Sequence, residues 1–145
     1  MNAAAAVLAV DDNATIRKAI SMRLGAQGFD VVTAADGASA LAMVARRPFD
    51  LIILDLQMPE MRGEEVLRRL RERYSPTQLP VIVLAASNDR TDIERTLELG
   101  ANDYIVKPGD LPILLARINT QLTLRDTVAQ LRTQSALLRE TQALN

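Results

Sequence analysis

The sequence of 145 residues lacks cysteine, histidine and tryptophan, and only 3% of its residues are aromatic. Without cysteine it has neither a disulfide framework nor a thiolate metal site. Without histidine it lacks the usual general base and the commonest zinc ligand. The opening stretch MNAAAAVLAVDD has no basic leader, and its apolar part is too short for a signal peptide or a membrane span. We therefore expect a cytoplasmic protein, with no membrane contact, whose chemistry uses carboxylates, lysine and hydroxyls.

The charges are nearly balanced, with 17 basic and 18 acidic residues. Such a chain has no broad basic field of the kind that gathers nucleic acid. In the most basic run, RGEEVLRRLRER (62–73), Glu64 and Arg68, and Glu65 and Arg69, stand four positions apart. That spacing favours a solvated helix face with ion pairs. We expect one domain of common size and no direct binding of nucleic acid by this segment.

Five short apolar runs alternate with amphipathic helical patterns along the chain. Candidate helix caps punctuate them, with Asn13 or Asp12 before the first helix, Asp36 before the second, Ser87 or Asn88 before the fourth, and Gly100 just after it. The alternation predicts an α/β fold in which a doubly wound parallel sheet of five strands has helices on both faces. The predicted strands are residues 5–10, 30–34, 51–55, 80–86 and 103–107.

Charged residues stand where the predicted strands end, and in a parallel sheet these ends meet at one ligand-binding crevice. Asp11 and Asp12 follow the first strand, Asp55 ends the third, and Lys107 ends the fifth. Three carboxylates in one small pocket repel one another unless a cation joins them, and oxygen ligands suit Mg²⁺. Lys107 adds a positive charge that can hold a phosphoryl oxygen. We therefore interpret Asp55 as a nucleophile that can become an aspartyl phosphate.

Each of these residues has a simpler interpretation when it is taken alone. Asp11 and Asp12 can cap a helix, Asp55 can form a turn, and Lys107 can be a solvated turn residue. Only the four together, each at the end of a strand, favour a phosphoryl site over these alternatives.

Four motifs of the sequence resemble those of the receiver domain of two-component response regulators, over about residues 5–120. They are VLAVDDN, DLIILDLQMPEMRGEEVLRRLR, LPVIVLAAS and GANDYIVKPGD. The resemblance implies the flavodoxin-like strand order 2-1-3-4-5. It also implies that Asp55 accepts a phosphoryl group from a sensor histidine kinase and that Lys107 binds that group. By the same resemblance, Asp12, Asp55 and the backbone carbonyl of Gln57 ligate Mg²⁺, with Asp11 acting through water.

The resemblance extends to the switch region, with one departure. Tyr104 matches an aromatic residue that changes rotamer on activation, and the bond before Pro108 is commonly cis in the family. At residue 85 the family usually has Thr or Ser, whose hydroxyl binds the new phosphoryl group, but this chain has Ala85. The lost contact is worth about 0.5 to 1.5 kcal/mol, and without it we expect weaker coupling between the site and Tyr104. In the alternative interpretation, Tyr104 is a core aromatic residue that does not switch. The hydroxyl of Ser87 or the backbone amide of Ala86 remain as substitutes.

Gln57 and Ser87 are also placed by the resemblance to flank the hydrolytic water, so that they set the lifetime of the phosphoryl group. A degenerate receiver that serves as a phosphorylation-independent dimerisation module remains an alternative, and Ala85 is its support. A phosphoaspartyl hydrolase is a second alternative, but such enzymes carry another acid two residues after the nucleophile, where this chain has Gln57. We therefore expect a protein that is not an enzyme.

After Pro112 the chain has neither glycine nor proline, so one helix of about 50 Å can run to its end. A first apolar stripe on this helix suits packing on the sheet, and a second stripe in a shifted phase faces away. The second stripe resembles a heptad seam and favours a parallel coiled coil, hence a homodimer, over a single fraying linker. We expect a receiver domain at 1–120 and a helical linker at 121–145 that leads to an output domain, by resemblance a diguanylate cyclase or hybrid kinase module. The first stripe is Leu111, Leu115, Ile118 and Leu122, and the second is Leu124, Val128, Leu131, Ser135 and Leu138.

Overall fold

The structure, a computed structural model, describes residues 4–107 and 109–144. Pro108, for which the resemblance implies a cis peptide bond, lies outside the described residues. Within those residues, no helix is long and apolar enough to cross a membrane.

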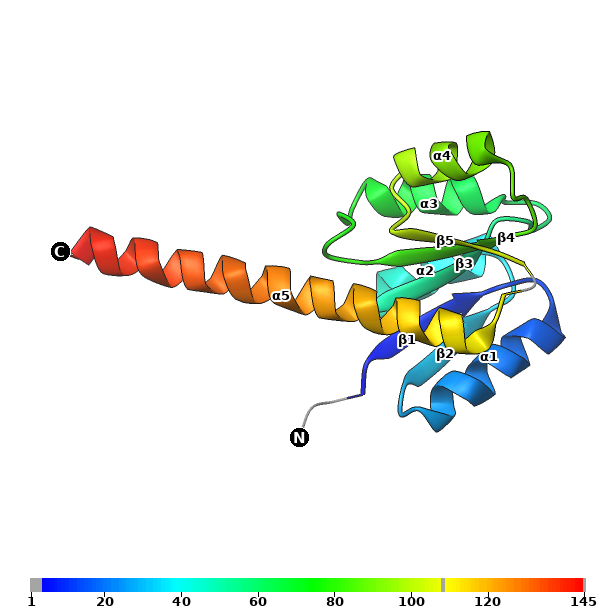
Figure 1. The fold of residues 1–145 in the computed structure, drawn as a ribbon, viewed down its shortest axis with the longest axis horizontal. Helices are drawn as coiled ribbons and strands as arrows, with labels where there is room; N and C mark the ends of the chain where they lie inside the picture. Colours follow the sequence, from blue (N-terminus) through cyan, green and yellow to red (C-terminus); the bar gives the residue numbers. More distant parts are fainter. Residues whose placement is uncertain (1–3, 108, 145) are drawn as a thin grey trace.

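A five-stranded sheet forms the centre of the molecule (Figure 1), and all its strand pairs are parallel. The strand order is β2-β1-β3-β4-β5, as the resemblance implies. Strands β1, β3 and β4 are buried along their whole length, because helices cover both faces of the sheet. The strands are β1 (Ala6–Val10), β2 (Asp30–Ala34), β3 (Leu51–Asp55), β4 (Val81–Ala85) and β5 (Asp103–Val106).

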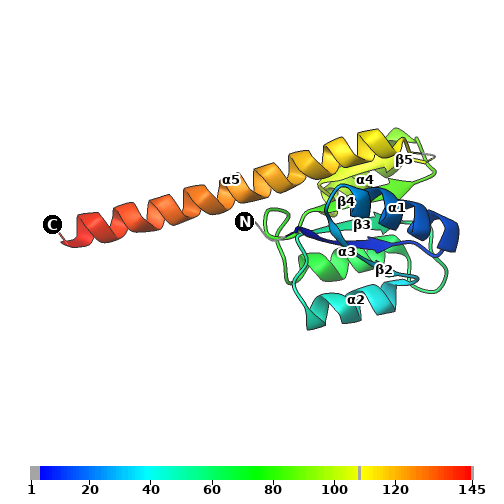
Figure 2. The same cartoon turned by 90° about the horizontal axis from the view of Figure 1, so that it is seen from below.

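Helices α1 (Ala14–Ala26) and α5 (Leu111–Leu144) cover one face of the sheet, and α2 (Gly37–Arg46), α3 (Gly63–Arg71) and α4 (Arg90–Glu98) cover the other (Figures 1 and 2). Alternate residues of each strand point to opposite faces, so the sheet divides the core in two. Val7 and Ala9 of β1 pack with α1 and α5, whereas Leu8 and Val10 pack on the other side.

The helix caps agree with the sequence except at α4. The side chain of Asn13 accepts hydrogen bonds from the backbone of α1, and Asp36 does the same for α2. Gly100 lies just past α4 with a φ of +112°, which favours glycine. The prediction of Ser87 or Asn88 as the cap of α4 is wrong, because Asp89 accepts the bond from the Thr91 amide.

The basic run on α3 is not a uniformly solvated face. Glu65 pairs with both Arg68 and Arg69, while the predicted pair of Glu64 with Arg68 is wrong, since Glu64 lies 3.6 Å from Arg62. Arg71 points inward, and its guanidinium donates to the carbonyl oxygens of Gly100 and Leu79 and to the side chain of Asn102, among others. Burial lowers the pKa of Arg71 to about 10. It therefore joins α3 to the segments before β4 and β5.

Helix α5 runs without a break through residue 120, where the sequence places a domain boundary, so that boundary stays a prediction. Leu114 and Ile118 are buried against the sheet, and Leu111, Leu115 and Leu122 are partly buried there. The first stripe is thus confirmed, although the sequence analysis missed Leu114. Residues 129–143 are all exposed, and this part projects well beyond the sheet (Figures 1 and 2).

Gly63 allows α3 to begin directly over the end of β3. Its backbone amide donates to the carbonyl oxygen of Leu56, 3.2 Å away, which closes the loop after β3. A Cβ atom at Gly63 would lie 2.5 Å from the Cα of Leu56 and 2.6 Å from the carbonyl oxygen of Asp55. Backbone atoms cannot yield as a flexible side chain can, so residue 63 must be glycine in this arrangement.

We predict that Gly63→Ala lowers the free energy of unfolding by about 1 to 3 kcal/mol, because the added methyl group overlaps the backbone of β3. The matched control is Gly25→Ala in α1, where an added Cβ meets no atom within 4 Å. That change should raise stability by about 0.5 to 1 kcal/mol through helix propensity. Urea unfolding measures both, and equal effects of the two changes would contradict the close approach.

Candidate functional site

The adjacent strands β1 and β3 bring three carboxylates together at their carboxyl ends. Val10, the last residue of β1, is paired with Leu54, so Asp11 and Asp55 follow on neighbouring strands. One carboxylate oxygen from each of Asp11, Asp12 and Asp55 lies within 4.8 Å of the others. Asp11 and Asp55 are each only 1% exposed, whereas Asp12 is exposed. The set offers only oxygen donors, open to solvent on one side, which suits a hard divalent cation.

Lys107, which directly follows the edge strand β5, brings a positive charge into this cluster. Its Nζ lies 3.0 Å from Oδ1 of Asp55 and 3.4 Å from Oδ2 of Asp11. The backbone amide of Lys107 donates to the carbonyl oxygen of Ala85, which holds the residue beside the end of β4. The side chain therefore crosses the end of β4 to meet the two buried carboxylates.

The cluster changes the acidity of its members. Burial raises the pKa of Asp55, and the charge of Asp11 adds to this, while the Gln57 amide and Lys107 pull the pKa down by a smaller amount. Burial alone would lower the pKa of Lys107, but its hydrogen bonds and charge interactions with Asp55 and Asp11 outweigh this and raise it. Lys107 is thus an ammonium at neutral pH. One ammonium leaves three carboxylates incompletely neutralised.

Backbone and side-chain hydrogen bonds orient the two buried acids. The backbone amide of Asn13 donates to Oδ1 of Asp11, at 2.9 Å, and the backbone amide of Gln57 donates to Oδ1 of Asp55, at 3.0 Å. Gln57 is itself exposed, and the role of its carbonyl as a metal ligand stays a prediction. Arg17 was missed by the sequence analysis, yet its guanidinium donates to the carbonyl oxygen of Asp11, at 2.7 Å. It stands on the first turn of α1, where basic residues give no distinct signal.

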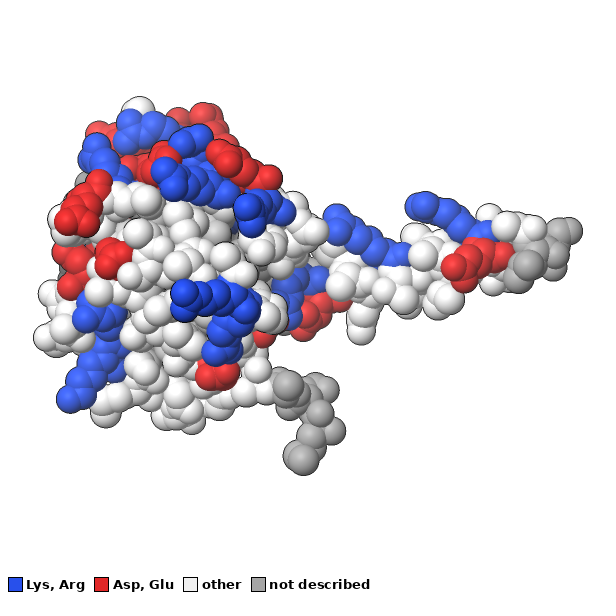
Figure 3. All heavy atoms as spheres, turned by 180° about the vertical axis from the view of Figure 1, so that it is seen from behind, with Lys and Arg blue, Asp and Glu red and all other residues white. Residues whose placement is uncertain are grey.

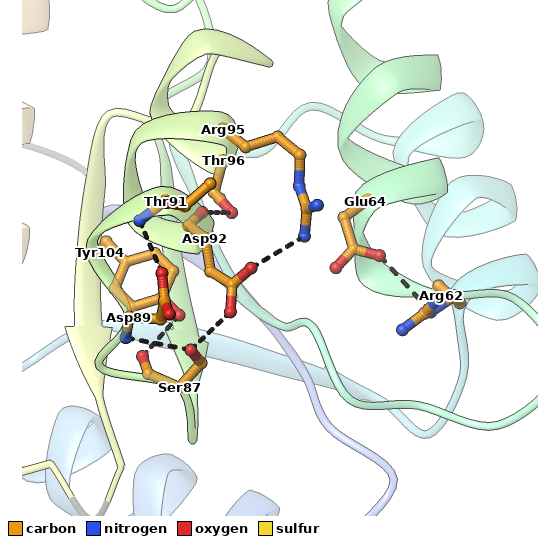
Figure 4. Close-up of polar contacts among 9 residues, drawn as sticks. All are labelled: Arg62, Glu64, Ser87, Asp89, Thr91, Asp92, Arg95, Thr96 and Tyr104. Carbon is orange, nitrogen blue, oxygen red and sulfur yellow. Dashed lines mark hydrogen bonds and ion pairs between the residues drawn. The ribbon is translucent and has the colours of Figure 1, made fainter.

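In the loop after β4, the side chain of Ser87 is bound to residues of that loop and of α4. Ala85 is buried at the end of β4 and Ala86 is exposed. The hydroxyl of Ser87 donates to Oδ2 of Asp92 on α4, at 2.7 Å, and accepts from the amide of Asp89 (Figure 4). In this structure the Ser87 hydroxyl is thus engaged with Asp92 and Asp89. Whether Ser87 or the backbone amide of Ala86 replaces the missing hydroxyl at residue 85 stays a prediction.

Tyr104 joins β5 to the same loop. Its hydroxyl donates to the backbone carbonyl oxygen of Ser87, at 2.8 Å, and its ring packs partly buried against the core (Figure 4). Burial raises the pKa of Tyr104, so the hydroxyl stays a donor at neutral pH. Asp92 in turn accepts from Arg95 on α4, at 3.2 Å. No pattern in the sequence indicates the role of Asp92, which depends on the contact of α4 with Ser87 in the loop after β4.

We predict that Asp55→Asn makes the protein more stable at pH 7 when a chelator removes divalent ions. The pKa of Asp55 is raised from 3.8 in the folded state. Its contribution to stability is therefore complete below about pH 4 and is lost as the pH rises through the folded value. Each pKa unit corresponds to about 1.4 kcal/mol. Urea unfolding measures the free energy of unfolding of the variant and of the unaltered chain, and the difference between the two should become smaller towards pH 4.

The control for this prediction is Asp36→Asn, since hydrogen bonds from Ser39 lower the pKa of Asp36. Its stability contribution is present above about pH 4 and is lost as the pH falls, so the control should have the opposite sign at pH 7. A gap for Asp55→Asn that does not vary with pH would contradict the account of burial given above.

Comparison with known proteins supports the same interpretation. The family model described as "Response regulator receiver domain" matches residues 7–119. The chain is 43% identical over 116 residues to a probable transcriptional regulator, ycf27, of Porphyridium aerugineum, which covers 80% of this chain and 47% of that protein. It therefore spans about half the length of the curated relatives it matches.

Solved structures agree in fold. The chemotaxis response regulator CheY4 of Vibrio cholerae has a TM-score of 0.76 and 35% identity, covering 81% of this chain and 98% of that one. A probable two-component response regulator/GGDEF domain protein has a TM-score of 0.80 and 35% identity, covering 84% and 50%. Taken with the acids and the lysine at the sheet's edge, these matches show that the chain belongs to the response regulator receiver domain family.

Proposed function

We propose that this receiver domain accepts a phosphoryl group on Asp55 from the phosphohistidine of a sensor histidine kinase. The contact of Asp55 Oδ1 with Lys107, 3.0 Å long, inside the three-acid cluster is the observation that carries the proposal. A carboxylate oxygen of Asp55 attacks phosphorus, the phosphorus–nitrogen bond breaks, and its electron pair stays on the imidazole. The ammonium of Lys107 then binds a phosphoryl oxygen in place of the carboxylate oxygen.

The donor set fits Mg²⁺, because the three acids offer carboxylate oxygens close enough to share one ion. Asp12, Asp55 and the carbonyl of Gln57 would hold it directly, and Asp11 through water. When bound, Mg²⁺ neutralises charge that spreads over the phosphoryl oxygens during transfer. The raised pKa of Asp55 supports this assignment, since a buried carboxylate beside another acid favours an added cation.

We further propose that α5 forms a homodimer and leads to an output domain beyond residue 145. The exposed apolar stripe on α5 supports the dimer. The output domain is supported by the length of the relatives, since this chain spans only about half of it. A transcriptional output is favoured by several curated relatives that are named transcriptional regulators, and a GGDEF output by two structural neighbours. The degenerate receiver remains the second candidate, because Ala85 cannot offer the usual hydroxyl.

We predict that acetyl phosphate with Mg²⁺ adds one phosphoryl group to the chain, and that Asp55→Asn abolishes the addition. Lys107→Gln should slow it about 10²-fold, because the developing charge loses its ammonium partner. Lys18→Gln, which changes an exposed lysine on α1, is the matched control and should leave the rate unchanged. Intact mass measures each case. A phosphoryl group on another residue, or none with Mg²⁺ present, would support the degenerate receiver.

We predict that Ala85→Thr strengthens the response of the loop after β4 to beryllofluoride and Mg²⁺. The new hydroxyl can donate to the phosphoryl mimic, a contact worth about 0.5 to 1.5 kcal/mol. Ala85→Val has the same branched shape without the hydroxyl, so it controls for crowding at this buried residue. Amide hydrogen exchange of residues 86–89 reports the response. Equal protection in the two variants would show that residue 85 does not couple the site to the loop.

A further inference from the structure

The distal half of α5 carries an apolar seam, which we define as Leu124, Val128, Leu131, Ser135 and Leu138. Its residues repeat at alternating four- and three-residue spacing, which places them on one side of a helix. Leu124, Leu131 and Leu138 are 53%, 57% and 63% exposed. A contiguous row of exposed apolar side chains is typical of an interaction surface. Figure 3 shows uncharged atoms along much of this projecting helix, with basic and acidic side chains between them.

A column of arginines lies beside the seam. Arg125, Arg132 and Arg139 are seven residues apart, and each directly follows a leucine of the seam. In a heptad with the leucines at d, these arginines occupy the e positions. The g positions on the other flank are uncharged and hold Thr127, Gln134 and Thr141, while Asp126 and Glu140 lie at f, away from the seam.

Building on the proposed dimer, we infer that the seam pairs with the seam of a second copy of this chain, in parallel and in register. In a parallel pair, e positions face g positions of the other helix, so Arg132 and Arg139 meet Thr127 and Gln134 of the partner, while Arg125 stays paired with Asp50 of its own domain. In an antiparallel pair, e positions face e positions, and Arg132 of one helix would lie against Arg132 of the other. The repulsion between the arginines therefore selects the parallel orientation.

The start of the seam is fixed to the domain by Arg125. Its Nη1 lies 2.7 Å from Oδ1 of Asp50 and 3.1 Å from the carbonyl oxygen of the same residue. Asp50 is held in turn, because its Oδ2 accepts from the amide of Ala6 on β1, at 2.7 Å. This pair holds α5 against the amino ends of β1 and β3, while Leu124, one residue earlier, stays exposed. The first residue of the seam thus lies beside this contact between α5 and the domain.

A second copy is the occupant that the chain's own features favour. Leucine repeats at every d position of the seam, and Ser135 at an a position can face Ser135 of the second copy, which helps to fix the register. A parallel pair also brings the distal ends of the two α5 helices side by side, where the proposed output domains would begin. An acidic partner helix would fit the arginines too, and the experiment below separates it.

The sequence contains no cysteine, so single cysteines report the pairing directly. We would make Val128→Cys and Leu138→Cys in the 145-residue chain, oxidise each alone and then an equal mixture, and separate the products by mass. A parallel in-register pair gives a disulfide dimer of each variant alone and no mixed disulfide, because the two residues are about 15 Å apart along the helix. The antiparallel pair gives mainly the mixed product, since Val128 then faces Leu138.

Thr133→Cys is the matched control, since residue 133 is exposed and lies on the opposite side of α5 from the seam. It should give at least tenfold less disulfide dimer than Leu138→Cys. Replacing Arg132 and Arg139 by Gln in the two cysteine variants should make the mixed product appear, because the repulsion against antiparallel pairing is gone.

Two outcomes overturn the inference. One is a predominant mixed disulfide in the unaltered background, and the other is a monomer in sedimentation with no more disulfide than the control, as expected if an acidic helix is the partner. Phosphorylation of the same chain by acetyl phosphate is measured separately. A monomer that still takes up a phosphoryl group on Asp55 sinks only the pairing, and a parallel dimer that takes up none sinks only the phosphoacceptor proposal.

Discussion

The ion pair between Lys107 and Asp55, with Asp11 beside it, is the interaction on which the site depends. Two carboxylates that are 1% exposed repel each other and lose hydration, and one ammonium 3.0 and 3.4 Å away offsets this. The strand order makes that contact possible, because β1 and β3 are neighbours and only β4 lies between β3 and β5. Gly63 contributes by letting α3 start over the end of β3.

The strands and the acidic cluster could be predicted because their signals are local. Apolar β-branched runs end on charged residues, and parallel strands carry those ends to one edge of the sheet. The cap of α4 could not, since Ser87, Asn88 and Asp89 can all cap a helix and tertiary contacts decide among them. Ser87 points to Asp92 because α4 presents a carboxylate there, which no spacing in the sequence reveals.

Residues that act through backbone carbonyls are also hidden from sequence patterns. Arg71 lies in a run that alternates in charge and was therefore interpreted as solvated, yet its guanidinium binds carbonyl oxygens of separate segments. Arg17 does the same at Asp11. A carbonyl gives no residue-type signal, so such partners emerge only from the fold. Leu114 lies three residues after Leu111 and four before Ile118, so helical spacing places it on the buried face of α5 beside Leu115.

Ala85 offers no hydroxyl through which a phosphoryl group on Asp55 could act on the loop after β4. The loop after β4 is already held by the bonds from Ser87 to Asp92 and from Tyr104 to Ser87, neither of which involves Asp55. If Asp55 is phosphorylated, the contact that must change is that of Lys107, which lies four residues before the start of α5. An apolar cavity of about 480 Å³ lies there, lined by Lys107, Leu111 and Leu114 among others, and gives the start of α5 room to shift. Since α5 continues unbroken to Leu144, its first turn and its projecting half belong to one helix, which the ion pair of Arg125 with Asp50 ties to the domain between them.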